Sequence, residues 1–217
     1  MKRNQSGFTL IEIAIVLVII GLLLGGVLKG QELINSAKVK NLIGDFKNVP
    51  VAIYGYQDKY KATPGDDSSA VSHLSAASGV VAGNGSGVID GQWNAVASNK
   101  ESYQFWQQIR LAGFGPGSLD NATTNSDYLP KNAVGGGIGV TSVADSPISG
   151  MKGTFVVCSN SIPGKFAKQI DLTLDDGNTA AGTIMVNSTT GTSYTATAAT
   201  ATGAVNDDGT FIVCMGF

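Results

Sequence analysis

The chain has 217 residues, of which 43% are hydrophobic and 14% charged, enough for one globular domain and an additional element. Its formal net charge is −2 and its only arginines are Arg3 and Arg110, which argues against nucleic-acid binding as its main task. Charge is unevenly distributed. Residues 29–61 contain six lysines and three acidic residues, a net charge of +3, whereas residues 62–217 contain six basic and twelve acidic residues, a net charge of −6. A mildly basic segment suits anionic lipid headgroups, and an acidic one suits solvent.

The chain begins with a short polar leader, residues 1–7, with the sequence MKRNQSG. An apolar span follows from Phe8 to Leu28, in which only Glu12 carries a charge. As a helix these residues would reach about 31 Å, which matches the hydrocarbon thickness of a bilayer. We therefore expect residues 8–28 to form a transmembrane or filament-core helix.

The position of Glu12 is unusual for a membrane segment, because a carboxylate at mid-membrane depth costs roughly 2.5–3.5 kcal/mol. A secretory signal peptide would have a shorter apolar region and a small-residue cleavage site after it, neither of which this sequence shows. A plain membrane anchor fits the length but leaves Glu12 without a role. Both interpretations are therefore disfavoured.

The next segment, residues 29–61, predicts an amphipathic helix. Its apolar residues recur at spacings of three and four, which is typical of one buried helical face: Val39, Leu42, Phe46, Val49, Ile53, Tyr56 and Tyr60. Pro50 predicts a kink or a weak turn within it. The Pro64-Gly65 pair is turn chemistry, so we expect one long helix from about Phe8 to about Tyr60.

The remaining residues, 62–217, predict a loop-rich α+β head. Residues 98–114 predict a short helix with Ser98 and Glu101 as a capping box and Gly113 as its stop. Strands are expected near 153–158, 170–174, 182–187 and 209–214, and the Thr/Ala tract 189–204 is compatible with strand or loop. The predicted fold class is α+β, with the long N-terminal helix packed on a small antiparallel sheet.

The two cysteines end matching segments, GTFVVC at Cys158 and GTFIVC at Cys214. Two such strands side by side would allow a disulfide between their ends, although a pair of buried thiols is the alternative. Closing that loop would stabilise the fold by about 4 kcal/mol on the chain-entropy model. A disulfide would imply an oxidising compartment outside the cytoplasm.

The hexapeptide GFTLIE, Gly7 to Glu12, followed by an apolar helix, resembles the N-terminal signature of type IV pilins and of type II secretion pseudopilins. The resemblance covers residues 1 to about 35 and continues only as architecture: a long helix, a sheet and a late cysteine pair. It implies cleavage after Gly7 by a prepilin peptidase and N-methylation of Phe8. Many members of the family carry a proline in the later part of the apolar helix. This chain has none there, and we expect Gly25-Gly26 to serve instead.

The resemblance also implies a role for Glu12 in filament assembly. The N-terminal helices bundle in such filaments, and Glu12 would meet the α-amino group of a neighbouring subunit. A charge pair inside an apolar bundle is strongly directional, because either partner alone is costly. The alternative is that Glu12 pairs with the amino group of its own Phe8, four residues away on the same helix face.

The implied function is that of a structural filament subunit and not of an enzyme. Its precursor would lie in the bacterial cytoplasmic (inner) membrane. Its partners would be other pilin subunits, the prepilin peptidase/methyltransferase, assembly-platform membrane proteins and the lipid bilayer. A type IV pilus on the cell surface is favoured, with adhesion among its functions. A periplasmic pseudopilus of type II secretion is the alternative, and a monomeric membrane-anchored binding domain is a third. No nucleic-acid partner is expected.

The segment NGSGVIDG, residues 84–91, resembles part of a calcium loop, with Asn84, Ser86 and Asp90 at suitable spacings. The ligand ring is incomplete, because Ala82 and Trp93 stand where the leading Asp and the bidentate Glu belong. We therefore favour a Gly/Asn turn and expect no cofactor, with calcium as the only candidate.

Carboxylates recur in pairs at residues 66–67, 175–176 and 207–208, and the last two pairs precede glycine. Paired carboxylates suit acid–base chemistry or metals, but Asp-Gly is also ordinary turn chemistry, which we favour. His73 is the only histidine and has no nucleophile motif around it. No catalytic residue is predicted.

Overall fold

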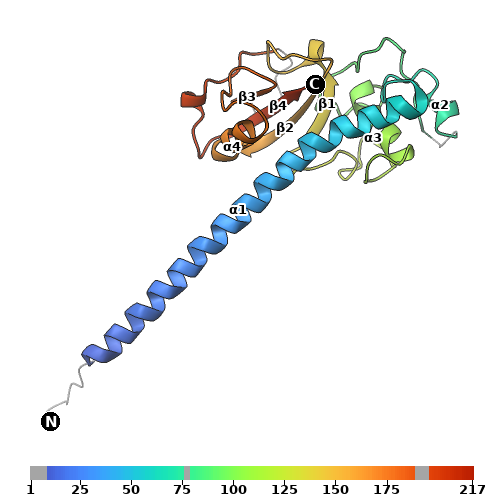
Figure 1. Ribbon diagram of the computed structural model, residues 1–217. Coiled ribbons are helices and arrows are strands. Elements are labelled where there is room, and N and C mark those ends of the chain that lie inside the picture. Colours follow the sequence, from blue (N-terminus) through green and yellow to red (C-terminus); the bar gives the residue numbers. More distant parts are fainter. Residues whose placement is uncertain (1–8, 76–78, 189–195) are drawn as a thin grey trace. The chain divides into compact units, whose positions relative to one another are not determined.

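A computed structural model describes residues 9–75, 79–188 and 196–217. The elements in chain order are α1 (Leu10–Tyr60), α2 (Ala70–His73), α3 (Glu101–Leu111), β1 (Ile138–Ser142), β2 (Phe155–Pro163), α4 (Gly164–Leu174), β3 (Ile184–Asn187) and β4 (Thr210–Gly216), with 3-10 turns at Val143–Asp145 and Thr202–Ala204 (Figure 1). The chain forms two compact units, residues 1–38 and 39–217. The boundary lies inside α1, so the C-terminal part of this helix belongs to the head.

In the first unit, the part of α1 that ends at Leu28 carries apolar side chains around its whole circumference. The large side chains from Leu10 to Leu28 are all exposed, with Leu10 at 93% and Leu28 at 66%. Among the described residues, α1 is the one helix that is long and apolar enough to cross a membrane, by length and composition. The long apolar helix predicted from the sequence is therefore present.

The second part of α1 packs on the head through a single face. The buried residues are Val39, Leu42, Phe46, Val49, Ala52, Ile53 and Tyr56. Six of the seven residues of the predicted stripe are among them, and Tyr60 is partly buried. The helix continues through Pro50 without a break, so the turn considered there is absent. Packing of this face outweighs the hydrogen bond that proline cannot donate.

The four strands form one antiparallel sheet in the order β1-β2-β4-β3. The strands predicted near 153–158, 182–187 and 209–214 are confirmed as β2, β3 and β4. The strand predicted at 170–174 is wrong, because these residues form the last turns of α4. Phe166, Ala167 and Ile170 are buried together, and their spacings of one, three and four are those of a helix. Strand β1 was not predicted, because a run of glycines precedes it and obscures its alternation.

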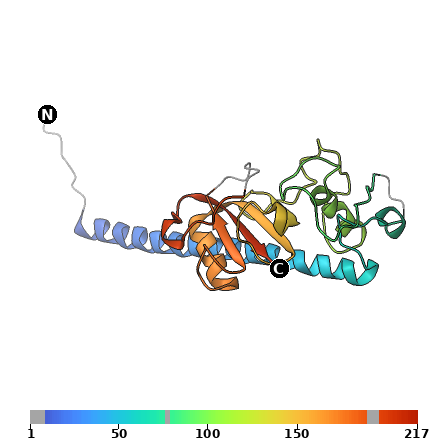
Figure 2. The same ribbon diagram turned by 90° about the horizontal axis from the view of Figure 1, so that it is seen from above.

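The sheet separates two apolar layers, because its side chains alternate between its faces. Helices α1 and α4 cover one face, where their apolar residues form a cluster with Val157, Val186 and Val213. The other face carries Val156, Met185 and Ile212, together with both cysteines, under residues from the surrounding loops. In Figure 2, α4 lies beside the strands, and it contacts β2, β3 and β4.

Helix α3 is buried along ten of its eleven residues. It ends as predicted: Gly113 has a φ of 87°, and the amide of Phe114 donates to the Ile109 carbonyl over 2.8 Å, as in a Schellman motif. The predicted capping box is wrong. The N-cap residue is Lys100, and the Glu101 carboxylate accepts hydrogen bonds from the amides of Asn84 and Asp90 instead.

Candidate functional site

The N-terminus of α1 is built around Thr9 and Glu12. The Glu12 Oε2 atom accepts hydrogen bonds from the Thr9 amide (2.7 Å) and the Thr9 hydroxyl (2.8 Å). The Glu12 amide donates in turn to the Thr9 hydroxyl over 3.3 Å. Since α1 begins at Leu10, Thr9 is the N-cap residue and Glu12 the third helical residue, which is a capping box.

This capping box is a contact that the sequence reasoning missed, although the pattern T-x-x-E at the start of an apolar run signals it. It gives Glu12 a local hydrogen-bond partner in the uncut chain. It leaves open both predicted ion-pair partners of Glu12, the α-amino group of a neighbouring subunit and that of its own Phe8. Both bonds use Oε2, so Oε1 is free of contacts from the described residues. The predicted cleavage site Gly7 and the predicted methylated residue Phe8 lie outside the described residues.

Beyond Glu12, the helix presents an apolar surface on every side. Gly21, Gly25 and Gly26 leave shallow positions on it, because glycine has no side chain, and these positions face open space, since a Cβ atom at any of them would meet nothing within 4 Å. Small residues of this kind let two helix backbones approach closely. The surface is therefore suited to a lipid bilayer or to the packing of further helices.

The cysteines lie in the sheet of the head. Cys158 and Cys214 are opposite each other in the β2–β4 register, and a disulfide joins them. Both are fully buried on the sheet face opposite α1, and they are 56 residues apart in sequence. The bond therefore ties the last strand of the chain to the middle of the sheet.

The candidate calcium loop is organised around a carboxylate and its backbone donors. Asp66 Oδ1 accepts hydrogen bonds from the amides of Gly85 (2.7 Å) and Ser86 (3.0 Å), and Asp66 Oδ2 accepts one from Gly87 (2.7 Å). Asn84 and Asp90 are brought together, because the side-chain Nδ2 atom of Asn84 donates a hydrogen bond to Asp90 Oδ2 over 2.8 Å. N–H groups thus point toward the buried side of this loop, where a cation would need oxygen atoms.

Glu101 fastens the same loop to α3. Its Oε1 accepts from the Asn84 amide over 3.0 Å and its Oε2 from the Asp90 amide over 2.8 Å. Burial raises the pKa of the Glu101 carboxyl, and these two amide donors oppose that rise. The loop is therefore held by two acidic residues, Asp66 and Glu101, that are far from it in sequence.

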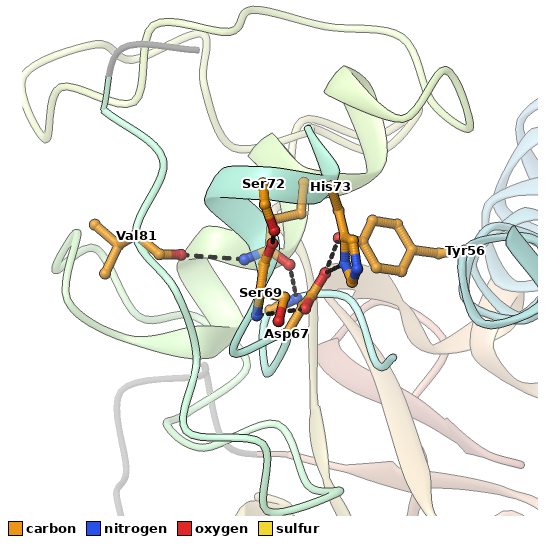
Figure 3. Close-up of polar contacts among 8 residues, drawn as sticks. Tyr56, Asp67, Ser69, Ser72, His73 and Val81 are labelled. Atoms are coloured by element: carbon orange, nitrogen blue, oxygen red, sulfur yellow. Dashed lines mark hydrogen bonds and ion pairs between the residues drawn. The ribbon is translucent and has the colours of Figure 1, made fainter. Parts of the chain in front are cut away.

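His73, which is partly buried, forms a polar cluster with the buried residues Tyr56 and Asp67 (Figure 3). Asp67 Oδ2 accepts a hydrogen bond from the Tyr56 hydroxyl over 2.7 Å and lies 2.7 Å from His73 Nδ1. Burial, followed by the bond to Asp67, raises the pKa of Tyr56. The Ser72 hydroxyl donates to the Ser69 carbonyl, not to the histidine. The cluster therefore joins the end of α1 to the following loop, and it shows no arrangement of a nucleophile with a base.

Comparisons with known proteins identify one feature of the chain. Residues 2–28 match a family model described as the prokaryotic N-terminal methylation motif, which is the prepilin-type motif of type IV pilins and pseudopilins. This match covers the leader, the Thr9–Glu12 capping box and the apolar part of α1. No curated protein and no solved structure matches the chain.

Proposed function

We propose that this chain, whose residues 2–28 carry the prepilin-type methylation motif, is the structural subunit of a type IV pilus-like filament on the cell surface. The motif supports a type IV pilin-like or pseudopilin subunit. The observation that carries the proposal is the exposed apolar surface of α1 from Leu10 to Leu28. A soluble monomer rarely exposes a contiguous apolar patch larger than a few hundred Å², so this surface requires lipid or other helices.

Two environments would cover this surface in succession. The precursor would insert α1 into the cytoplasmic membrane, with the basic leader on the cytoplasmic side. After cleavage beyond Gly7, the helices would leave the bilayer and pack together in the core of the filament. Gly21, Gly25 and Gly26 support close packing, because their positions have room for a neighbouring helix.

Glu12 would direct this packing. Cleavage creates a new α-amino group on Phe8. The Glu12 Oε1 atom could accept a hydrogen bond from this amine, because both bonds to Thr9 use Oε2 and no other described residue contacts Oε1. Pairing with a neighbouring subunit would neutralise both charges inside the apolar core and fix the stagger between adjacent helices. The prepilin peptidase/methyltransferase, the assembly platform and the bilayer are the partners that this pathway requires.

A surface pilus is favoured over a periplasmic pseudopilus of type II secretion. The support is the disulfide-bounded C-terminal region together with the size of the head, residues 39–217. A buried disulfide fits a subunit on the cell surface and one in the periplasm alike, so the preference for the surface depends on the resemblance of the disulfide-bounded region to that of pilins. Adhesion is among the functions that such a surface fibre would serve.

Intact-mass spectrometry on fibres sheared from the cell surface tests the proposal. We expect a mass that begins at methylated Phe8 and increases by two hydrogens on reduction. A processed protein that remains in the membrane fraction, together with a secretion defect in a deletion strain, would favour the pseudopilus. An uncut chain that begins at Met1 would overturn both.

A further inference from the structure

The C-terminal end of α4 brings three carboxylates together. Asp171 lies in the last turns of α4, and Asp175 and Asp176 follow directly after the helix ends at Leu174. One carboxylate oxygen from each residue lies within 4.8 Å of those of the other two. Three negative charges in so small a space repel one another unless a proton or a cation separates them.

Asp171 is the unusual member of this group. Its side chain is fully buried beside Ala167 and Ile170 on the packed face of α4, and neither of its carboxylate oxygens has a hydrogen-bond partner among the described residues. A buried carboxylate normally has several donors, because burial without them is strongly unfavourable. Burial, followed by the nearby charges of Asp175 and Asp176, raises the pKa of Asp171 to about 6.

The other two carboxylates are held in place by the backbone. Asp175 Oδ2 accepts hydrogen bonds from the amides of Thr183 (2.6 Å) and Ile184 (2.9 Å), at the start of β3. Gly182 permits this approach, because a Cβ atom at that position would collide with the same oxygen. Asp176 Oδ1 accepts from the Asn178 amide over 2.8 Å. Backbone amides therefore fix one oxygen of each of these two carboxylates.

The basic side chain nearest in sequence does not neutralise the cluster. Lys168, three residues before Asp171 on α4, donates to Asp207 Oδ1 over 2.9 Å. Asp171, Asp175 and Asp176 form no salt bridge among the residues that the structure describes.

We propose that Asp171, Asp175 and Asp176 bind a divalent cation, and that this cation is calcium. Calcium takes six to eight oxygen ligands at 2.3–2.6 Å, so two ligands of one ion are at most about 5 Å apart, which fits the spacing here. Three carboxylates leave the remaining positions to water and backbone carbonyls. The affinity should be that of an extracellular site, with a dissociation constant of about 0.1–1 mM.

The site differs from the loop at residues 84–90 in the atoms that it presents. In that loop, backbone amides donate to both oxygens of Asp66 and to both oxygens of Glu101, so these carboxylates already have hydrogen-bond donors. At the end of α4, the carboxylates Asp171, Asp175 and Asp176 face one another. A cation there would fix α4 to β3, which is an edge strand of the sheet.

Calcium binding is testable on the full chain in detergent micelles after removal of divalent cations. Titration with CaCl2 should release or absorb heat with a half-saturation of about 0.1–1 mM. The thermal midpoint should rise by about 3–6 °C at ten times the dissociation constant. In Asp171→Asn both effects should disappear, while the midpoint without calcium equals or exceeds that of the unmodified chain, because an unpaired buried charge is gone.

Two further variants distinguish binding at this cluster from binding at other carboxylates. Asp176→Asn changes an exposed residue that preserves folding, and it should weaken calcium binding at least tenfold. Asp208→Asn removes an exposed carboxylate outside the cluster and should leave binding unchanged. The proposal is overturned if the unmodified chain shows no response at about 10 mM calcium, far above the expected affinity. It is equally overturned if Asp90→Asn, and not Asp171→Asn, abolishes the response. Binding of magnesium with equal affinity would overturn the assignment to calcium.

Discussion

Cys158 and Cys214 are directly opposite each other on β2 and β4, and their disulfide lies on the sheet face that α1 does not cover. The strands alternate so that Val157 and Val213, the residues just before the cysteines, point to the helix-covered face. One face of β2 and β4 thus packs against α1, and the opposite face carries the disulfide that joins the two strands.

Removing this disulfide should destabilise the head. For Cys158→Ser combined with Cys214→Ser we expect a loss of about 2–5 kcal/mol in the free energy of unfolding, because the unfolded chain regains the freedom of a 56-residue loop. Urea unfolding of the full chain in micelles, with and without a reductant, measures the loss. As a control, the reductant should have no effect on the double variant. Equal stability of the reduced and oxidised chains would contradict the prediction.

Replacement of Glu12 separates assembly from processing. Glu12→Ala should abolish surface fibres and leave the precursor cleaved and membrane-bound, because the intersubunit charge pair is lost while the cleavage site is intact. Shearing of cells, followed by immunoblotting of the fibre and membrane fractions, measures both. Normal fibres in this variant would rule out the assembly role.

Thr9 and Glu32 provide matched controls for that experiment. Thr9→Ala removes the capping partner of Glu12 at a cost of about 1 kcal/mol but keeps the carboxylate, so fibres should persist. Glu32→Ala removes an exposed charge whose one ion-pair partner among the described residues is Lys29 on the same helix, and it should assemble normally. Loss of fibres in Thr9→Ala would instead assign the importance of Glu12 to the helix cap.

The buried bond between Tyr56 and Asp67 should contribute to stability. Tyr56→Phe removes one donor from a buried carboxylate, for which we expect a loss of about 1.5–3 kcal/mol in the free energy of unfolding. Tyr54→Phe is the matched control, because Tyr54 lies on the exposed side of the same helix and is 53% exposed. Denaturant unfolding of both variants makes the comparison. An equal effect of the two substitutions would show that the buried bond contributes nothing specific.

Asp45 should make the stability of the head depend on pH. Burial raises the pKa of Asp45 to about 6 in the folded chain, above the ordinary value of 3.8. Between these values the folded state holds a proton that the unfolded state has lost. Stability contributed by this group is therefore present at acidic pH and falls as the pH rises through 6. The largest change that the shift supports is about 3 kcal/mol.

The variant Asp45→Asn should reduce the fall in stability between pH 4 and 7 and increase stability at pH 7, while Asp171, whose pKa burial also raises to about 6, contributes a second fall in both chains. Lys40 and Lys131 line the same hollow as Asp45, and their charges would reduce the effect without reversing it. Asp58→Asn is the control, because the Asp58 side chain is 91% exposed and, within the part of the chain that the structure describes, forms an ion pair with Lys61 alone. Urea unfolding at several pH values between 4 and 8 measures the difference. A stability difference between Asp45→Asn and the unmodified chain that does not grow as the pH rises from 4 to 7 would contradict the assignment.

Features that depend on neighbours in the sequence were predictable. The GFTLIE motif, the apolar span and the three-and-four spacing of Leu42, Phe46 and Val49 each depend on a short window, and the structure and the motif match confirm them. The alternation in GTFVVC and GTFIVC likewise predicted two strands. It left a disulfide and a pair of buried thiols as alternatives, because strand order is not encoded in a single strand.

Features that depend on distant partners were decided by the tertiary structure. Asp66 and Glu101 were not predicted to hold the loop at residues 84–90, because their amide donors are up to 21 residues away. The same reason explains the missed contact of Tyr56 with Asp67, and the error at 170–174, where α4 forms because its apolar face packs on the sheet.

By itself, the sequence determined a membrane-compatible helix with a processing motif, because hydrophobic length, periodicity and a contiguous hexapeptide are local properties. Only the tertiary structure decided which side chains meet. The pairing of Cys158 with Cys214 and the contact of Asp175 with the amides of Thr183 and Ile184 both require distant backbone segments to be placed by packing. Burial then sets the desolvation cost of each charged group. Two aspartates that are identical in sequence differ in this cost when one lies in solvent and the other lies inside the head.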